Sequence, residues 1–244
     1  MRVVAALLFA GALGVNGLAN GLPLNDRTTG ELAALYPNLF VPAGVTFSIW
    51  GVIYLALAVW AVVQFLPRWA GWGRTMAPYF AVASALNASW LFAWHWEQVG
   101  LSVLVMLGLL GVLVLANGRL LRGGPLPARI AFGLILGWIC VATIANVTAL
   151  LVAVGWGGLG LGDAPWAAIM TAVGAGVGGA AALHLRNPYL GWAVVWALSG
   201  IVLARWDDVS WIAWVAGAGA LGVAGAAILA GLRPLPSRAP APGG

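Results

Sequence analysis

The sequence predicts an all-α protein that crosses a membrane about eight times. Three observations lead to this fold class: the composition, a series of long apolar stretches, and a separation of charges along the chain. Of the 244 residues, 63% are hydrophobic and only 7% are charged, whereas soluble domains carry roughly 25% charged residues. Most of the protein surface is therefore expected to face lipid instead of water.

The apolar stretches have the length of membrane spans. A helix needs about 20 apolar residues to cross roughly 30 Å of hydrocarbon. Glu97 and Gln98 alone separate the third stretch from the fourth, which predicts a tight helical hairpin. A signal peptide is an alternative for the first stretch, but Asn16 and Asn20 interrupt it and no clear A-x-A cleavage site follows. The eight predicted spans are 3–22, 45–66, 77–96, 99–117, 130–154, 165–185, 188–204 and 209–232.

The charged residues fall on two sides of the predicted bundle. If the N-terminus is inside, nine of the eleven basic residues lie in inside connections, as is typical of cytoplasmic loops. We therefore predict a multi-pass protein of the plasma membrane with both termini in the cytoplasm. The formal charge of +5 then reflects topology, and we expect the lipid bilayer, not a nucleic acid, as a partner. The inside set is Arg2, Arg68, Arg74, Arg119, Arg122, Arg129, Arg186, Arg233 and Arg238; the outside set is Arg27, Arg205, Asp26, Glu31, Glu97, Asp163, Asp207 and Asp208.

Two regions of different composition follow one another along the chain. The first five spans, within residues 1–155, carry Asn, Trp, Tyr, Ser and Thr at helical spacing, and we predict that they form one membrane bundle. Residues 156–232 supply three further spans, and the Pro-rich tail 233–244 is predicted to be a disordered cytoplasmic segment. The other connections are short, apart from the outside loop 23–44, so no soluble domain is expected.

Small residues at four-residue spacing mark the sixth and eighth spans. Gly174 and Gly178 form a G-x-x-x-G motif, and Ala218 and Gly222 form a looser version of it. Such residues allow helix backbones to approach closely in lipid. They are compatible with a homodimer face or with helix packing within one chain, and we favour the second interpretation because such motifs are common.

Several kinds of chemistry are disfavoured. No span has an Asp, Glu, Lys or Arg in its interior, which argues against a pump but leaves a passive carrier open. Cys140 is the single cysteine, so no intramolecular disulfide can form. His95 and His184 are predicted at opposite sides of the membrane, without an acid beside either, so we expect no metal site and no hydrolytic site.

Aromatic and amide side chains share helix faces in three of the spans. An asparagine amide in hydrocarbon must find a hydrogen-bonding partner, so these faces should point into the bundle. A ring of Trp, Tyr and Asn suits a flat, largely apolar ligand with a few polar edges. The alternative is that the amides bond to each other between helices and the aromatic rings fill space. The faces are Phe47, Trp50 and Tyr54; Asn87, Trp90 and Trp94; and Trp138, Ala142 and Asn146.

The same residues resemble the translocator-protein family of tryptophan-rich sensory proteins (TspO/MBR). In that family the second helix follows a Pro-rich turn and carries Phe, then Trp and Tyr four residues apart. Its third helix has Leu-Asn followed by Trp, and its fifth has Trp-x-x-x-Ala-x-x-x-Asn. Here the three blocks occur in the same order over residues 1–155, as Pro42, Phe47, Trp50 and Tyr54; Leu86, Asn87 and Trp90; and Trp138, Ala142 and Asn146.

The resemblance has departures. Pro42-Ala43 replaces a pair of prolines, and the fifth helix has Ile135, Leu136 and Gly137 where the family has Pro-Tyr-Leu. The Tyr-then-Arg pattern of sterol-binding members does not follow the fifth-helix motif. The three further spans have no counterpart in the five-helix family, so the chain resembles an extended, divergent member.

The resemblance implies a five-helix bundle with a pocket that binds tetrapyrroles and, in some members, sterols. Trp50, Asn87, Trp90, Trp138 and Ala142 would line that pocket. Together with the other members of the three faces, they give a predicted ligand site of Phe47, Trp50, Tyr54, Asn87, Trp90, Trp138, Ala142 and Asn146. A porphyrin or haem would then be a ligand, and we expect no resident cofactor.

Four functions follow from these observations. The first is a sensor or passive carrier for a planar hydrophobic metabolite, which the resemblance favours. A transporter or permease is the second, with the three further spans completing a substrate path. The third is an enzyme that promotes light-driven breakdown of porphyrins, as suggested for family members, with Trp50 or Trp138 as the reactive group. The last is a structural partner of another membrane protein that uses the Gly-rich faces.

Overall fold

The computed structural model describes residues 1–21 and 24–235, which form α-helices joined by short turns. Residues 236–244 of the predicted disordered tail lie outside the described part. The helices are α1 (Arg2–Gly21), α2 (Thr29–Ala34), α3 (Ile49–Val63), α4 (Ala70–His95), α5 (Val99–Leu120), α6 (Leu126–Ala153), α7 (Asp163–His184), α8 (Pro188–Arg205) and α9 (Ser210–Leu232). The 3-10 turns are η1 (Leu24–Asp26), η2 (Gly44–Ser48), η3 (Pro67–Trp69) and η4 (Gly158–Gly160).

Each predicted span corresponds to a long helix. Seven segments of the described chain are long and apolar enough to cross a membrane, among them η2 with α3 and every long helix except α4. The exception, α4, has 26 residues, but its Trp, Ser and Asn residues lower its mean hydropathy. Those polar groups are tolerated because α4 packs between α1 and α5, and Ser84 and Asn87 are buried there.

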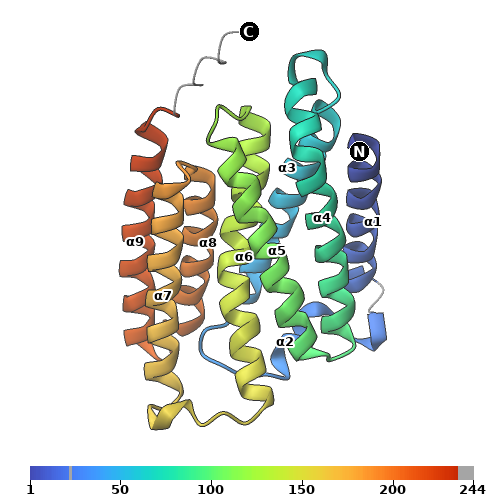
Figure 1. Cartoon of the computed structure of the whole chain (residues 1–244). Coiled ribbons are helices and arrows are strands. Elements are labelled where there is room, and N and C mark those ends of the chain that lie inside the picture. Colours follow the sequence, from blue (N-terminus) through green and yellow to red (C-terminus); the bar gives the residue numbers. More distant parts are fainter. Residues whose placement is uncertain (22–23, 236–244) are drawn as a thin grey trace.

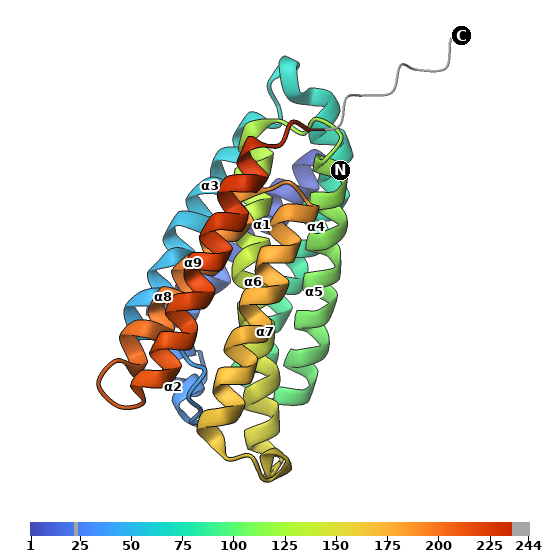
Figure 2. The ribbon, with the colours of Figure 1, turned by 90° about the vertical axis from the view of Figure 1, so that its left-hand side faces the viewer.

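The helices form an elongated bundle that follows the chain from one edge to the other. Figure 1 shows α1 and α4 at one edge, α6 in the middle, and α7, α8 and α9 at the other edge. The principal contacts are α1 on α4, α4 on α5, α5 on α6, α3 and α8 on α6, and α9 on both α7 and α8. Figure 2 shows the same helices running alongside one another through the length of the molecule. The core therefore continues from the first helices into the last three.

The charges separate between the two ends of the bundle. We call the end where α1 begins the basic end, because Arg2, Arg119, Arg129 and Arg186 lie at helix termini there. The opposite end, called the acidic end, carries all six acidic residues of the sequence on the loops and helix termini that meet there. The segregation agrees with the predicted topology. Which end faces the cytoplasm, and in which membrane, stays a prediction.

Helix α8 approaches α6 closely at two glycines. A Cβ atom on Gly137 would overlap the carbonyl oxygen of Leu190 and lie 2.9 Å from the Cβ of Ala193. One turn earlier, a Cβ on Gly133 would lie 2.8 Å from the Cγ of Asn187. The glycine at position 137, one of the departures from the TspO/MBR pattern, thus has a physical reason: the backbone of α8 crosses α6 at this point.

Buried amides join the two regions near the basic end. Asn187, which is 2% exposed, lies between α7 and α8, and its Oδ1 accepts from the backbone N–H of Tyr189 at 3.2 Å, capping α8. Its Nδ2 donates to Oδ1 of Asn117 on α5 at 2.9 Å and to the carbonyl of Arg129 at 3.0 Å. Asn117 in turn donates to the carbonyl of Phe132 at 2.9 Å. The contacts between residues 1–155 and 156–232 are therefore close and specific, and the division of the chain into these two regions stays a prediction.

The small-residue motifs differ in their surroundings. A Cβ on Gly178 would lie 2.8 Å from the side chain of Val194, and one on Gly174 would lie 3.2 Å from that of Ile144, so this motif packs within the chain. Ala218 and Gly222 on α9 are exposed, and a Cβ at position 222 would meet nothing within 4 Å. The motif of Gly174 and Gly178 thus serves helix packing within one chain, which is the interpretation favoured from the sequence. A homodimer through α9 stays a prediction.

Candidate functional site

The eight predicted site residues gather between α3, α4 and α6, in the half of the bundle nearer the acidic end. Phe47 belongs to η2, which leads directly into α3. The i, i+3 and i+4 spacings place the members of each helix on one inward face. The remaining positions are Trp50 and Tyr54 on α3, Asn87 and Trp90 on α4, and Trp138, Ala142 and Asn146 on α6.

Aromatic rings form a continuous cluster at the centre of this region. Trp50 stacks on Tyr54 with ring centroids 5.1 Å apart and an interplanar angle of 20°. Trp138 meets the edges of Trp50 at 6.1 Å and Phe47 at 5.7 Å. Trp138 is 4% exposed and lines none of the described cavities, so it supports the two rings in front of it. Edge-on aromatic pairs of this kind hold their members in a fixed orientation.

Asn87 connects three helices. Its Oδ1 accepts from Nδ2 of Asn16 on α1 at 3.0 Å and lies 3.4 Å from the hydroxyl of Tyr54 on α3. The asparagine itself is 5% exposed. Of the two roles considered from the sequence, a tie between helices or a contact to the ligand, these hydrogen bonds favour the tie.

Asn146 makes a second connection of the same kind. Its Oδ1 accepts from Nε1 of Trp90 on α4 at 3.2 Å, and its Nδ2 donates to Oγ of Ser102 on α5 at 3.0 Å. Ser102 was not among the predicted residues, because a single serine in an apolar span gives no periodic signal. The amide fixes the Trp90 indole and joins α4, α5 and α6.

The largest described cavity lies beside this cluster and has a volume of about 550 Å³. We call it the aromatic pocket. It is bounded by α1, α3 and α4, and the first residues of α2 lie over it. Its lining residues are Leu13, Asn16, Gly17, Thr28, Thr29, Gly30, Gly44, Phe47, Trp50, Tyr54 and Trp90. Four of the eight predicted residues thus line it, and the contributions of α1 and of the 28–30 segment were not predicted.

Two smaller cavities adjoin the aromatic pocket. One of about 80 Å³ shares Phe47 and Trp90 with it and is also lined by Pro42, Ala142 and Asn146. Phe47 and Trp90 therefore separate the two spaces.

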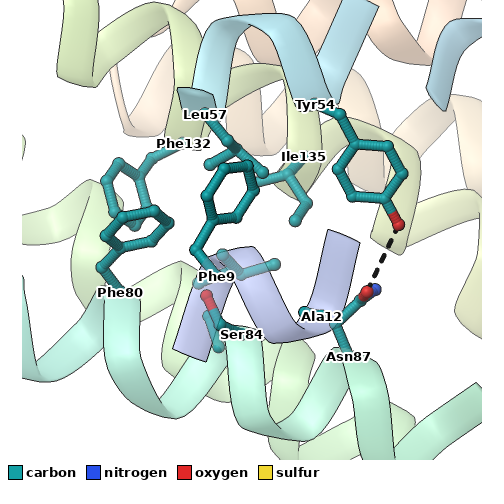
Figure 3. A pocket seen from close by; sticks show the side chains of 11 residues that line it. Phe9, Ala12, Tyr54, Leu57, Phe80, Ser84, Asn87, Phe132 and Ile135 are labelled. Atoms are coloured by element: carbon teal, nitrogen blue, oxygen red, sulfur yellow. Dashed lines mark hydrogen bonds between the residues drawn. The ribbon is translucent and has the colours of Figure 1, made fainter. Parts of the chain in front are cut away.

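The other cavity lies beneath Tyr54 and has a volume of only about 10 Å³, which is close to the minimum for one water molecule. Figure 3 shows its apolar walls, including Phe9, Phe80 and Phe132, and the Tyr54 hydroxyl directed at Asn87. Asn87 lines this cavity and not the aromatic pocket. This closely packed region forms the floor of the aromatic pocket.

A segment between α1 and α3 covers the aromatic pocket at the acidic end. It is attached to the end of α4 by an ion pair of Arg27 and Glu97 at 3.1 Å and by a hydrogen bond from Nδ2 of Asn25 to the carbonyl of His95 at 2.9 Å. A capping box begins α2: the backbone N–H of Glu31 donates to Oγ1 of Thr28, and the backbone N–H of Thr28 donates to the Glu31 carboxylate. The hydroxyl of Thr28 also donates to this carboxylate. These hydrogen bonds lower the pKa of Glu31 below its ordinary value.

The electrostatic character of the aromatic pocket is neutral. Its polar groups are the amide of Asn16, the hydroxyls of Thr28, Thr29 and Tyr54, and backbone atoms, and no carboxylate or guanidinium lines it. Within residues 1–21 and 24–235, no group of three or more His, Cys, Asp or Glu side chains is placed to hold a metal ion. The arrangement can enclose and orient an uncharged or delocalised ring system.

The fold and this site define a class: an integral membrane protein of long helices with an aromatic-walled pocket. The chain belongs to the family described as TSPO-like protein, whose model matches residues 2–229. The match extends through α7, α8 and most of α9, beyond the motif resemblance over residues 1–155. Neither the curated proteins nor the solved structures compared with the chain gave a match.

Proposed function

We propose that the aromatic pocket binds a planar, largely apolar molecule of the tetrapyrrole type, and that the protein acts as a sensor or passive carrier for it. One observation supports this proposal above the others: a cavity of about 550 Å³ walled by Phe47, Trp50, Tyr54 and Trp90. The volume is within the range of small-molecule sites, which are typically about 300–1,000 Å³. Stacked aromatic rings provide flat surfaces that match a flat ligand.

The polar groups of the pocket fit the same proposal. Asn16, Thr28 and Thr29 lie on α1 and the covering segment. A ligand with an apolar ring and a polar edge can therefore place the ring on Trp50 and Trp90 and direct its edge toward these groups. The lack of a charged lining residue favours passive binding over ion-coupled movement, since coupling sites in membranes are normally ionisable residues.

The test is a titration of the detergent-purified protein with protoporphyrin IX, followed by the porphyrin absorbance and with a neutral apolar dye as a control ligand. Trp50→Leu removes one wall of the pocket and should weaken binding at least about tenfold, because it deletes a stacked aromatic surface. Trp214→Leu is the matched variant: Trp214 is 67% exposed on α9 and lines no described cavity. It should bind like the unmodified protein.

Equal porphyrin affinity in the two variants, or an absorbance change that never saturates, would overturn the proposal. A protein that binds neither porphyrin nor dye would instead favour the structural-partner function.

A further inference from the structure

A separate cavity lies at the acidic end of the bundle, between the end of α6, the start of α7 and the loop that leads to η2. Its volume is about 180 Å³, and we call it the seam pocket. The loop carrying Asn38 separates it from the 80 Å³ cavity, which that residue also lines. The seam pocket is lined by Pro37, Asn38, Leu39, Phe40, Thr148, Leu151, Val152, Trp156, Gly157, Gly158, Gly162, Asp163, Trp166, Ala167 and Met170.

Defined helix termini place two tryptophans in its wall. At the end of α6, Gly155 has a φ of 66°, and the backbone N–H of Trp156 donates to the carbonyl of Leu151 at 3.0 Å. This is a Schellman motif, which turns the chain back over the helix end. Gly162, with a φ of 76°, precedes α7. The rings of Trp156 and Trp166 then meet with centroids 4.8 Å apart at 65°, so they form two adjacent walls.

One carboxylate lies beside these rings. Asp163 is three residues before Trp166 in the first turn of α7, so both side chains share a helix face. It is the single ionisable residue that lines the seam pocket. Its carboxylate has no hydrogen bond or ion pair among the described residues, unlike that of Asp208, which pairs with Arg205. Stabilisation of the helix dipole is the general reason for an acid at this position, but it does not account for the two indoles.

We propose that the seam pocket binds a small organic cation with a quaternary or protonated ammonium group. The ammonium group would lie against the faces of Trp156 and Trp166 through cation–π attraction, with Asp163 as its counter-ion. Leu39 and Met170 provide apolar contacts for the alkyl substituents. All acidic residues of the chain lie at this end of the bundle, together with only two of the arginines that the structure describes, which favours a cation over an anion. The site is distinct from the aromatic pocket and does not depend on the function proposed there.

The ammonium group has two sources with the same chemistry: a free solute such as choline, or the headgroup of phosphatidylcholine in the surrounding bilayer. Two experimental arms distinguish them. In the first, equilibrium binding of tritiated choline is measured to protein in maltoside micelles, which contain no choline headgroups. In the second, native mass spectrometry counts the phosphatidylcholine molecules that remain on protein released from nanodiscs of mixed phosphatidylcholine and phosphatidylglycerol.

Both arms use the same variants. We expect Asp163→Asn and Trp166→Leu to weaken saturable binding, or retention of phosphatidylcholine, about tenfold. Trp166→Phe keeps an aromatic face and should lose less than Trp166→Leu, while Asp163→Glu should retain most of the binding. Asp207→Asn and Trp214→Leu are matched controls at the same end of the bundle, outside the described cavities, and should behave like the unmodified protein.

The neutral isostere of choline, 3,3-dimethyl-1-butanol, tests the charge directly and should not compete. Saturable choline binding that needs Asp163 identifies a free solute, and retained phosphatidylcholine that needs Asp163 identifies a headgroup; either result supports the proposal. The proposal is overturned if neither arm shows binding, if the isostere competes equally, or if Asp163→Asn binds as well as Asp207→Asn.

Discussion

The first five long helices and the last three belong to one membrane bundle, but they pack in different ways. In α1 and α3–α6, large flat rings and amides meet across the helices, and the described cavities lie among them or at their border with α7. In α7–α9, small residues interlock: a Cβ on Gly191 would lie 2.7 Å from the Cβ of Ala227, and one on Gly219 would lie 2.9 Å from that of Ala175.

The difference shows how a membrane bundle can combine a pocket with a stable framework. In the first region, hydrogen-bonded amides join the helices beside the aromatic rings, and space remains among them. Small residues bring helix backbones together and gain dispersion contacts over the whole helix length. None of the described cavities is lined by a residue of α8 or α9.

The largest effect is expected where the two regions meet. Gly137→Leu should lower the free energy of unfolding by about 3 kcal/mol or more, because its side chain has no space against the α8 backbone. SDS-induced unfolding in mixed micelles measures this change. Gly222→Leu on the open face of α9 is the control and should leave unfolding nearly unchanged. Equal loss in both variants would mean that α8 does not approach α6 as described.

A smaller effect is expected from the amide ties of the first region. Asn146→Ala leaves the Trp90 indole N–H and the Ser102 hydroxyl without their shared partner, so stability should fall by about 1–2 kcal/mol in the same unfolding measurement. Ser89→Ala removes only an exposed hydroxyl that bonds to its own helix and serves as the control. A neutral Asn146→Ala variant would show that the aromatic rings set the helix spacing without the amide.

The next prediction concerns the contact by which the last helices support the aromatic pocket. Nε1 of Trp196 on α8 donates to the carbonyl of Thr46 at 2.7 Å, and the N–H of Ala43 donates to the carbonyl of Gly200 at 3.0 Å. These bonds hold the η2 segment that carries Phe47. Trp196→Phe should cost about 1 kcal/mol of stability and weaken porphyrin binding about fivefold.

Trp192→Phe is the control for that experiment. Trp192 lies one turn earlier on α8 and is 45% exposed, close to the 44% of Trp196, but its indole N–H makes no hydrogen bond among the described residues. A fall in affinity for both variants would point to a general effect on lipid contact and would contradict a specific support from α8.

The smallest effect on stability is expected at the attachment of the covering segment. Glu97 has a φ of 55° at the end of α4, a conformation that favours glycine by roughly 1 kcal/mol. Glu97 forms an ion pair with Arg27, and both side chains are nearly half exposed. The pair therefore contributes only about 0–1 kcal/mol to the free energy of unfolding. Glu97→Gly should therefore leave stability almost unchanged while porphyrin dissociates faster, as stopped-flow release would show. Unaltered release would mean that the segment is held by its other contacts alone.

Much of this architecture could be predicted from hydropathy and charge, because a bilayer restricts the chain to apolar helices. The limits of the helices were less accurate: α4 begins at Ala70, not at residue 77, since a helix continues past the apolar stretch into the interfacial region. Periodicity also identified the three aromatic faces. Periodicity could not predict the hydrogen bond between Asn117 and Asn187, which are 70 residues apart in the sequence. Nor could it predict that Thr28 and Thr29 lie over the aromatic pocket, because both features depend on tertiary packing alone.

The amide of Asn187 also has a consequence for the order in which the protein is assembled. The chain is synthesised from its N-terminus, so α5 and α6 enter the membrane before this residue exists. Until it arrives, Oδ1 of Asn117 and the carbonyl of Arg129 lack the donor that joins them in the finished fold. A nascent chain that stops before Asn187 therefore leaves Oδ1 of Asn117 without this donor at the basic end, and the arrival of the last helices supplies it.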